Sequence, residues 1–175
     1  AIEDHFTPDR SYISSLDNRG KKREVAVLGK FYETLNDVRI LWVSQAEPAG
    51  FGDAVLKAEY LVGDSQFLVH AGDTYIISRN DEHLSRLLNC HSKLEADATF
   101  IVHRVRDPRR HGIAMVKKIC KGICEVLEVV EKPDIPRTDL AIVPLYVFKP
   151  KIMEMLKSVT PGKEGEIQLT DAIQG

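Results

Sequence analysis

The stretch QFLVHAGDTY, residues 66–75, decides the fold that we expect for this chain. Phe67, Leu68 and Val69 form a short apolar run that stops at Gly72 and Asp73. Such a run, bounded by a Gly-Asp turn, is typical of a buried strand in an α/β sheet. Ligands of open α/β sheets bind beyond the carboxyl ends of strands, which makes this Gly-Asp pair a candidate site. The simpler interpretation is an ordinary turn, because Gly-Asp is common turn chemistry.

The rest of the chain predicts further strands and amphipathic helices. Strands are expected over 38–43, 67–71, 98–105, 113–118, 126–131 and 140–148. Helices fall between them through the first hundred residues, and a hairpin follows. This order predicts an α/β fold, Rossmann-like, with a mixed, mainly parallel sheet flanked by helices. Pro144 predicts a bulge or an unpaired position in the last strand, and Asp53 is expected to cap a helix.

Length and composition set limits on the class of protein. The chain has 175 residues, of which 43% are hydrophobic and 29% charged, with a net charge of −2. We expect one domain over residues 1–175, and neither nucleic acid nor membrane as a partner. The cysteines, Cys90, Cys120 and Cys124, are few and odd in number, which favours reduced thiols in a cytoplasmic protein. A homo-oligomer stays open.

The loop QAEPAGFG, residues 45–52, is the first of four clusters that could carry chemistry. The amide of Gln45 donates and accepts hydrogen bonds, as the edge of a nucleobase does. Pro48 stiffens the loop and Gly50 lets the backbone approach a flat ring. Taken alone, the loop is better explained as a plain connection between a strand and a helix.

The other three clusters contain carboxylates. Asp73 follows the strand described above, and its hard oxygens suit magnesium. Gly112 precedes a predicted hairpin whose far end carries Glu131 and Lys132, residue types that can bind sugar hydroxyls and a phosphate. Asp171 ends the segment GEIQLTD, residues 165–171, and could be a second metal ligand. A turn, a strand end and a helix cap are the respective simpler interpretations.

The order and spacing of these clusters resemble the sugar-nucleotide pyrophosphorylases, a family of nucleotidyltransferases. The matching segments are AIEDHF at 1–6, QAEPAGFGDAV at 45–55, FLVHAGD at 67–73, HGIAMV at 111–116, VVEKP at 129–133 and GEIQLTDAI at 165–173. The last segment is most similar to UTP–glucose-1-phosphate uridylyltransferases. The Gly-Asp pair is more similar to glucose-1-phosphate thymidylyltransferases.

The resemblance implies a role for each candidate residue. Base contacts would come from Gln45 and Gly50, with Pro48 shaping their loop and Gly72 beside the nucleotide. Sugar contacts would come from Gly112 and Glu131, with Tyr146 as a weaker candidate. Three residues would act in catalysis: Lys132 on the sugar phosphate, and Asp73 and Asp171 on Mg²⁺.

The implied reaction joins a nucleoside triphosphate, UTP or dTTP, to a sugar 1-phosphate such as glucose 1-phosphate. Two departures stand against it. Pro144 occupies a position where many relatives have Gly, and the N-terminal strand with its Gly-rich GxGTRxxP loop is absent from residues 1–175. We therefore expect a single nucleotidyltransferase domain of the nucleotide-diphospho-sugar transferase type, truncated at the N-terminus, incomplete at both ends and inactive alone.

Two alternatives belong to other functional classes. The first is a non-catalytic relative that binds sugar nucleotides or serves as a regulatory subunit, which the absent loop favours. The second is an oxidoreductase with a dinucleotide site, which would need GxGxxG after a strand. No such sequence occurs here.

Overall fold

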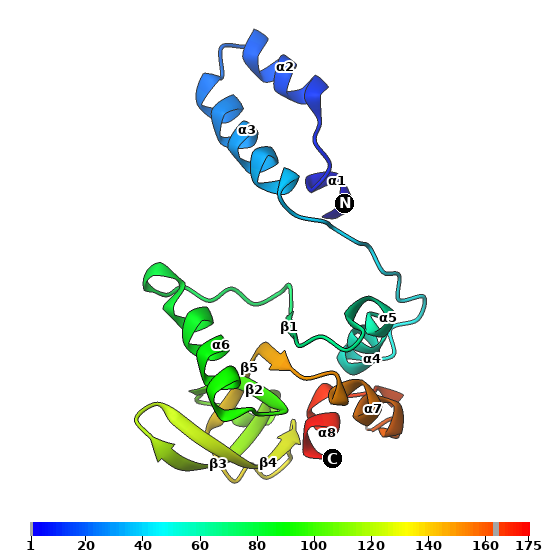
Figure 1. Ribbon diagram of the computed structural model, residues 1–175, viewed down its shortest axis with the longest axis vertical. Helices are drawn as coiled ribbons and strands as arrows, with labels where there is room; N and C mark the ends of the chain where they lie inside the picture. The colour runs from blue at the N-terminus through cyan, green and yellow to red at the C-terminus, as the bar shows by residue number, and fades with distance from the viewer. Residues whose placement is uncertain (1, 163–164) are drawn as a thin grey trace. The chain divides into compact units, whose positions relative to one another are not determined.

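The computed structural model describes residues 2–162 and 165–175, so that Ala1 of the AIEDHF match lies outside the described residues. The chain divides into two compact units, Ala1–Trp42 and Val43–Gly175 (Figure 1). The prediction of a single domain over 1–175 stays a prediction. No described helix is both long enough and apolar enough to cross a membrane.

The first unit is helical, with α1 over Ile2–His5, α2 over Arg10–Asn18 and α3 over Lys22–Asn36. Asp9 caps α2, since its Oδ1 accepts a hydrogen bond from the Tyr12 amide at 2.9 Å. The rings of Phe6, Phe31 and Trp42 form an aromatic cluster. The ring centroids of Phe31 and Trp42 each lie 6.0 Å from that of Phe6.

The predicted strand over residues 38–43 is wrong for the structure. These residues carry no strand pairing, and the side chains of Leu41 and Trp42 are 65% and 50% exposed. β-Branched and aromatic residues favour a strand mainly through packing against neighbouring strands. None of the described strands is hydrogen-bonded to this segment as a ladder partner.

Among its described residues, the second unit contains the sheet and five α-helices. The helices are α4 over Phe51–Leu56, α5 over Glu59–Val62, α6 over Glu82–Leu94, α7 over Lys151–Ser158 and α8 over Leu169–Gln174, and short 3-10 turns occur at Arg79–Asp81 and Pro108–Arg110. The strands are β1 over Phe67–His70, β2 over Ala98–Arg104, β3 over Gly112–Cys120, β4 over Ile123–Glu131 and β5 over Leu140–Phe148.

β5 is the central strand of the sheet. β2 pairs along one side of it, while β1 and β3 pair with the other side, and β4 extends the sheet beyond β3. Every pairing between the described strands is antiparallel, so the prediction of a mainly parallel sheet is wrong. The reason is that β1 and β2 run in the same direction but are separated by β5, which runs in the opposite direction. Among the described strands, β1 pairs with β5 alone.

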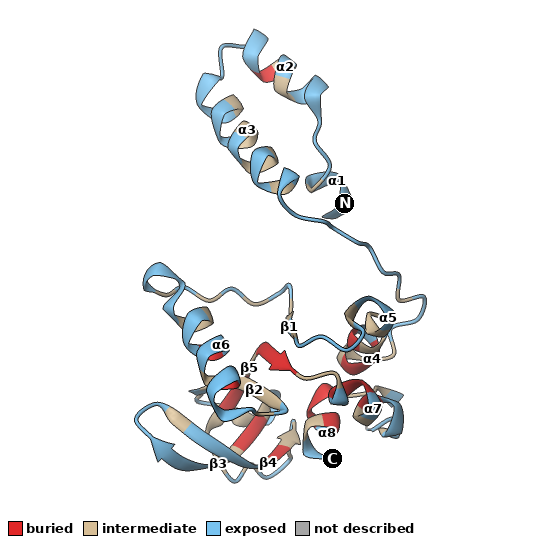
Figure 2. Ribbon diagram, viewed as in Figure 1, coloured by how far each residue is buried: buried red, intermediate tan, exposed pale blue. Residues whose placement is uncertain are grey.

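Both faces of the sheet are covered by helices, which confirms the predicted α/β architecture (Figure 1). On one face, Ile142, Tyr146 and Phe148 of β5 pack with α4, α7 and α8 in the larger core. On the other face, Leu145 and Val147 pack with Leu87 of α6. Burial is accordingly concentrated on β5, α7 and α8 (Figure 2). Alternate residues of β5 thus anchor the two layers of helices.

The bulge predicted at Pro144 is confirmed. β2 pairs Phe100 with Tyr146 but Ile101 with Val143, so the register shifts opposite Pro144 and Leu145. Proline has no N–H to donate to a neighbouring strand. Its carbonyl oxygen still accepts a hydrogen bond from the Ala71 amide, at 3.0 Å, on the β1 side.

His91 of α6 is a buried titratable group in this fold. Its side chain is 2% exposed, its Nδ1 lies 2.9 Å from Thr99 Oγ1, and its Nε2 has no hydrogen-bond partner among the described residues. Burial lowers the pKa of this imidazole from its ordinary 6.5, with a further contribution from the nearby Lys149 ammonium. The folded protein therefore favours neutral His91.

We expect acid to destabilise the protein through His91. Above pH 6.5 the imidazole is neutral in both the folded and the unfolded state, whereas below it the unfolded state binds a proton more readily. The free energy of unfolding should therefore fall as the pH drops below 6.5 towards the lowered folded-state pKa. Urea titrations between pH 5 and 8 measure this dependence. His91→Gln should flatten it, with His103→Gln on the exposed end of β2 as the control; equal slopes for wild type and His91→Gln would contradict this expectation.

Candidate functional site

Two of the predicted site segments lie along one side of β5. β1 pairs with Leu145–Phe148 of β5. Near the start of β3, Ile113 pairs with Ala141 of β5. The turn that holds Gly72 and Asp73 leaves β1 at this point, and it is closed by a hydrogen bond from the Thr74 amide to the Ala71 carbonyl at 3.3 Å. Asp73 is exposed there. The Gly-Asp pair thus lies in a turn that directly follows the hydrogen bond between the Ala71 amide and the Pro144 carbonyl of β5, and its role in a site stays a prediction.

Gly112, Glu131 and Thr170 meet at the start of β3. Gly112 is the partner of Glu131 in the β3–β4 ladder, and Glu131 Oε2 accepts a hydrogen bond from Thr170 Oγ1 at 3.0 Å. A Cβ atom on Gly112 would lie 2.9 Å from that same carboxylate oxygen and 2.9 Å from Thr170 Cγ2. Thr170 is 4% exposed, so the carboxylate is held by a fixed donor. Any side chain at position 112 would displace this arrangement.

Lys132 follows Glu131 at the end of β4 and is exposed. Its backbone has a φ of +37°, in the left-handed region that non-glycine residues rarely adopt, and its amide donates to the His111 carbonyl at 3.1 Å. The chain therefore turns sharply at Lys132 and leaves the ammonium group in solvent. An exposed cation beside the Glu131 carboxylate is suited to a phosphate attached to a bound polyol.

The predicted base loop is joined to the segment before α8 by two backbone hydrogen bonds. The Gly52 amide donates to the Ile167 carbonyl at 2.9 Å, and the Ile167 amide donates to the Ala49 carbonyl at 2.8 Å. Gly50 has a φ of +100°, and a Cβ atom there would lie 2.7 Å from the Ile167 carbonyl oxygen. The positive φ and the close backbone approach both require glycine at position 50. Pro48, by contrast, is exposed within this loop.

Asp53 is a candidate site residue that its sequence position does not reveal, because an acidic residue there is typical of a helix cap. The N-cap of α4 is Gly50, and Asp53 lies in the first turn with 7% of its surface exposed. Its Oδ2 accepts a hydrogen bond from Gln45 Nε2 at 2.7 Å, and its Oδ1 lies 3.1 Å from Lys57 Nζ. The bond from Gln45, followed by the influence of Lys57, lowers the pKa of the Asp53 carboxyl below its ordinary 3.8. Only the spacing of Gln45, Asp53 and Lys57 could have indicated this network.

Asp171 lies in the first turn of α8 and is exposed. Its side chain lines a pocket of about 370 Å³ between the end of α7 and α8, where its Oδ2 would be 3.6 Å from a Cβ atom on Gly162. No group of three or more His, Cys, Asp or Glu side chains that could hold a metal ion occurs within 2–162 and 165–175. The structure thus does not bring Asp73 and Asp171 into one such group, and their role as metal ligands stays a prediction.

Tyr146 lies in the larger core and not on the surface. Its side chain is 4% exposed, and its ring centroid is 5.4 Å from that of Phe148, in a stacked arrangement, and 5.9 Å from that of Phe100. Burial raises the pKa of its phenol well above the ordinary value of 10.0, and the Glu131 carboxylate adds to this shift. Tyr146 is therefore a neutral core residue close to Glu131, and its contact with a sugar stays a prediction.

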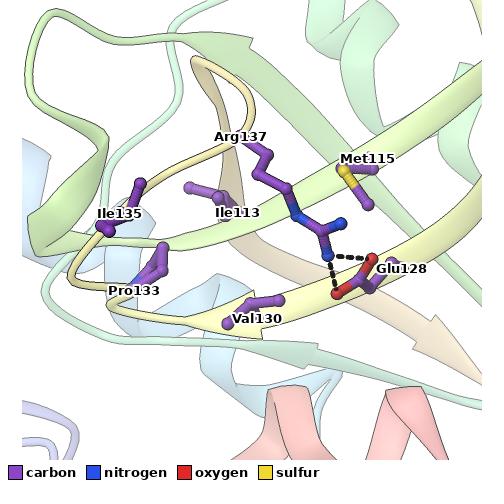
Figure 3. Close-up of a pocket in the computed structure, with 7 residues that line it drawn as sticks. All are labelled: Ile113, Met115, Glu128, Val130, Pro133, Ile135 and Arg137. Atoms are coloured by element: carbon purple, nitrogen blue, oxygen red, sulfur yellow. Dashed lines mark hydrogen bonds and ion pairs between the residues drawn. The ribbon is translucent and has the colours of Figure 1, made fainter.

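A second pocket, of about 220 Å³, lies on the other face of the β3–β4 hairpin (Figure 3). Val130 lines it, whereas the neighbouring Val129 packs into the larger core and Glu131 binds Thr170. The Arg137 guanidinium pairs with the Glu128 carboxylate at its edge (Figure 3). Because strand residues alternate between faces, this pocket is separate from the site around Glu131.

Comparison with known proteins assigns this arrangement to a class. The sequence model described as nucleotidyl transferase matches residues 12–175, and the chain belongs to that family. It is 36% identical over 182 residues to UTP–glucose-1-phosphate uridylyltransferase 2 of Streptococcus pyogenes serotype M1, a match that covers 99% of this chain and 59% of the relative.

Solved structures agree with this assignment. The UTP-bound UGPase from Acinetobacter baumannii matches with a TM-score of 0.82 and 31% identity, over 99% of this chain and 60% of that one. A UDP-glucose pyrophosphorylase without ligand matches with a TM-score of 0.85 and 26% identity, over 99% of this chain and 64% of that one. The chain therefore spans about 60% of the length of these relatives.

The contact between the base loop and residue 167 generates a prediction about Gly52. A Cβ atom there would lie 2.7 Å from the Ile167 carbonyl oxygen, a backbone atom that cannot move aside easily. Gly52→Ala should therefore destabilise the protein by about 1–3 kcal/mol, as overpacked sites do. Gly72→Ala is the matched control, since nothing lies within 4 Å of its Cβ position. Urea unfolding of both variants measures the difference, and equal midpoints would show that the contact is not tight.

Proposed function

We propose that the full-length protein is a sugar-1-phosphate nucleotidyltransferase that forms a nucleoside-diphosphate sugar and pyrophosphate. One observation carries this proposal: the segment Glu166–Asp171 joins two predicted subsites. At Ile167 it binds the base loop, and at Thr170 it binds Glu131 beside Gly112. The candidate base and sugar residues are thus held by one short segment. The names of the relatives support the same activity.

The residues suit a reaction that depends on alignment and charge. The phosphate of a sugar 1-phosphate is already ionised at neutral pH, and it attacks the α-phosphorus of the triphosphate while pyrophosphate leaves. No general base is required, so catalysis rests on positioning and on neutralising charge. Gly112 and Glu131 would hold the sugar, and Lys132 would pair with its phosphate.

Mg²⁺ is the cofactor that we propose for this reaction. Asp73 and Asp171 are exposed carboxylates with hard oxygen atoms, which fits an ion that takes one or two carboxylates and completes its shell with water and substrate phosphates. Bound Mg²⁺ would neutralise charge on the phosphates. The role of this chain is to supply the two carboxylates from the turn after β1 and from the first turn of α8.

We propose a pyrimidine nucleotide as the substrate, with UTP favoured over dTTP by the names of the relatives. Gln45 and Gly50 would contact the base, with Gly72 near the nucleotide. The alternative is a non-catalytic relative that binds sugar nucleotides, which the absence of a GxGTRxxP loop from residues 1–175 favours. Pyrophosphate release from UTP and glucose 1-phosphate by the full-length protein separates the two. We expect no turnover by residues 1–175 alone.

Asp73→Asn tests the proposed metal ligand. The amide keeps the size of the side chain but removes its negative charge, so kcat should fall by orders of magnitude in the full-length protein. The melting temperature should hardly change, because Asp73 is exposed in a turn. Asp64→Asn, at another exposed position, is the control. Near-normal turnover of Asp73→Asn in saturating Mg²⁺ would contradict the assignment.

Lys132→Ala tests the proposed phosphate contact. A charged hydrogen bond is worth about 1.5–3 kcal/mol, so kcat/KM for glucose 1-phosphate should fall roughly 10- to 150-fold. The KM for UTP should change little. Lys121→Ala, in the turn at the opposite end of the same hairpin, is the control. An unchanged kcat and KM for the sugar phosphate would place Lys132 outside the site.

A further inference from the structure

The side-chain amide of Gln45 is held in one orientation. Its Nε2 donates to the Gly50 carbonyl at 3.2 Å and to Asp53 Oδ2 at 2.7 Å. Both partners are acceptors, so the two N–H bonds of the amide are used and its orientation follows from the chemistry. A flipped amide would place its own oxygen against two other oxygens.

Asp53 is the stronger of these two partners. Its carboxylate is 7% exposed and is ionised at neutral pH, because the hydrogen bond from Gln45 and the Lys57 ammonium lower its pKa. Each of its oxygens has its own partner, Gln45 on Oδ2 and Lys57 on Oδ1. Hydrogen bonds to an ionised group are stronger than those between neutral groups.

The second partner is held by the backbone. Gly50 has a φ of +100°, and the loop around it is hydrogen-bonded to Ile167 through the Ala49 carbonyl and the Gly52 amide. The Gly50 carbonyl is therefore a fixed acceptor. Gln45 is clamped from two directions.

The oxygen of the Gln45 amide is left over. Among the described residues, no group donates a hydrogen bond to Gln45 Oε1, and this oxygen is not one of the buried polar atoms that lack a partner. It is therefore open to solvent or to a ligand. Gln45 can accept a hydrogen bond but cannot donate one.

We propose that Asp53 is a positioning residue for base specificity, which clamps the Gln45 amide so that only its oxygen faces the nucleotide. This inference rests on the proposed function, in which Gln45 contacts a pyrimidine. Uracil and thymine carry an N–H at position 3 and can donate to that oxygen. Cytosine has an unprotonated nitrogen there, and its lone pair would face the oxygen. The site accepts a base of the imide class and rejects cytosine.

Binding of UDP-glucose and CDP-glucose to the full-length protein tests this inference, since the two ligands differ only in the base. Isothermal titration should show a preference for UDP-glucose of roughly 10- to 100-fold in the wild type. In Asp53→Asn, Lys57 attracts the Asn oxygen, which turns the Asn NH₂ towards Gln45 and favours the flipped amide. The preference should then fall to about one.

Two further variants separate positioning from a structural role. Asp53→Asn with Lys57→Met should regain part of the preference, because the Asn oxygen is then free to face Gln45. Lys57→Met alone should keep it, since the carboxylate remains an acceptor. A general loss of structure would weaken the binding of both ligands, and the preference for UDP-glucose over CDP-glucose would not follow this order among the variants.

The outcomes distinguish the inference from the function on which it rests. Equal affinity of the wild type for the two ligands, or an unchanged preference in Asp53→Asn, would overturn the role of Asp53 and leave the proposed function standing. If the wild type binds neither ligand, the proposed function fails and the inference fails with it.

Discussion

The pairing of β5 on both of its sides is the constraint on which the second unit depends. This strand carries side chains into both cores, so its backbone must be satisfied by neighbouring strands and not by water. β2 fills one side, whereas β1 and β3 share the other. The bulge at Pro144 falls where β1 ends, and the Ala71 amide closes that end on the proline carbonyl. The turn with Gly72 and Asp73 therefore leaves the sheet at a place set by β5.

The candidate site depends on a second shared element, the segment Glu166–Asp171. Its backbone binds the loop before α4, and its Thr170 hydroxyl binds the carboxylate at the end of β4. Gly50 of this loop lies about 120 positions before Ile167 in the sequence, and Glu131 lies about 40 positions before Thr170. Glycine at positions 50 and 112 is what allows such close contact. The site is thus assembled by close backbone approach as much as by its polar side chains.

Several features could not be predicted from local patterns. The residues over 38–43 have strand propensity, yet they are unpaired here because propensity requires a neighbouring strand. The antiparallel pairing of the sheet does not follow from the order of elements along the chain, because β5, the last strand, lies between β1 and β2. Asp53 was expected at a helix cap, whereas its partners are Gln45 from the loop before α4 and Lys57 just after α4.

The sequence by itself determined the α/β class, the positions of β1 to β5, the bulge at Pro144 and the family, because apolar periodicity, proline chemistry and motif spacing are local properties of the chain. It also marked Gln45, Gly112 and Glu131 as candidates by their residue type. Only the tertiary structure decided which groups meet: Glu131 with Thr170, and Gln45 with Asp53 and Gly50. Hydrogen bonds between residues distant in sequence depend on strand order and on close backbone approach, and neither is encoded within a single motif.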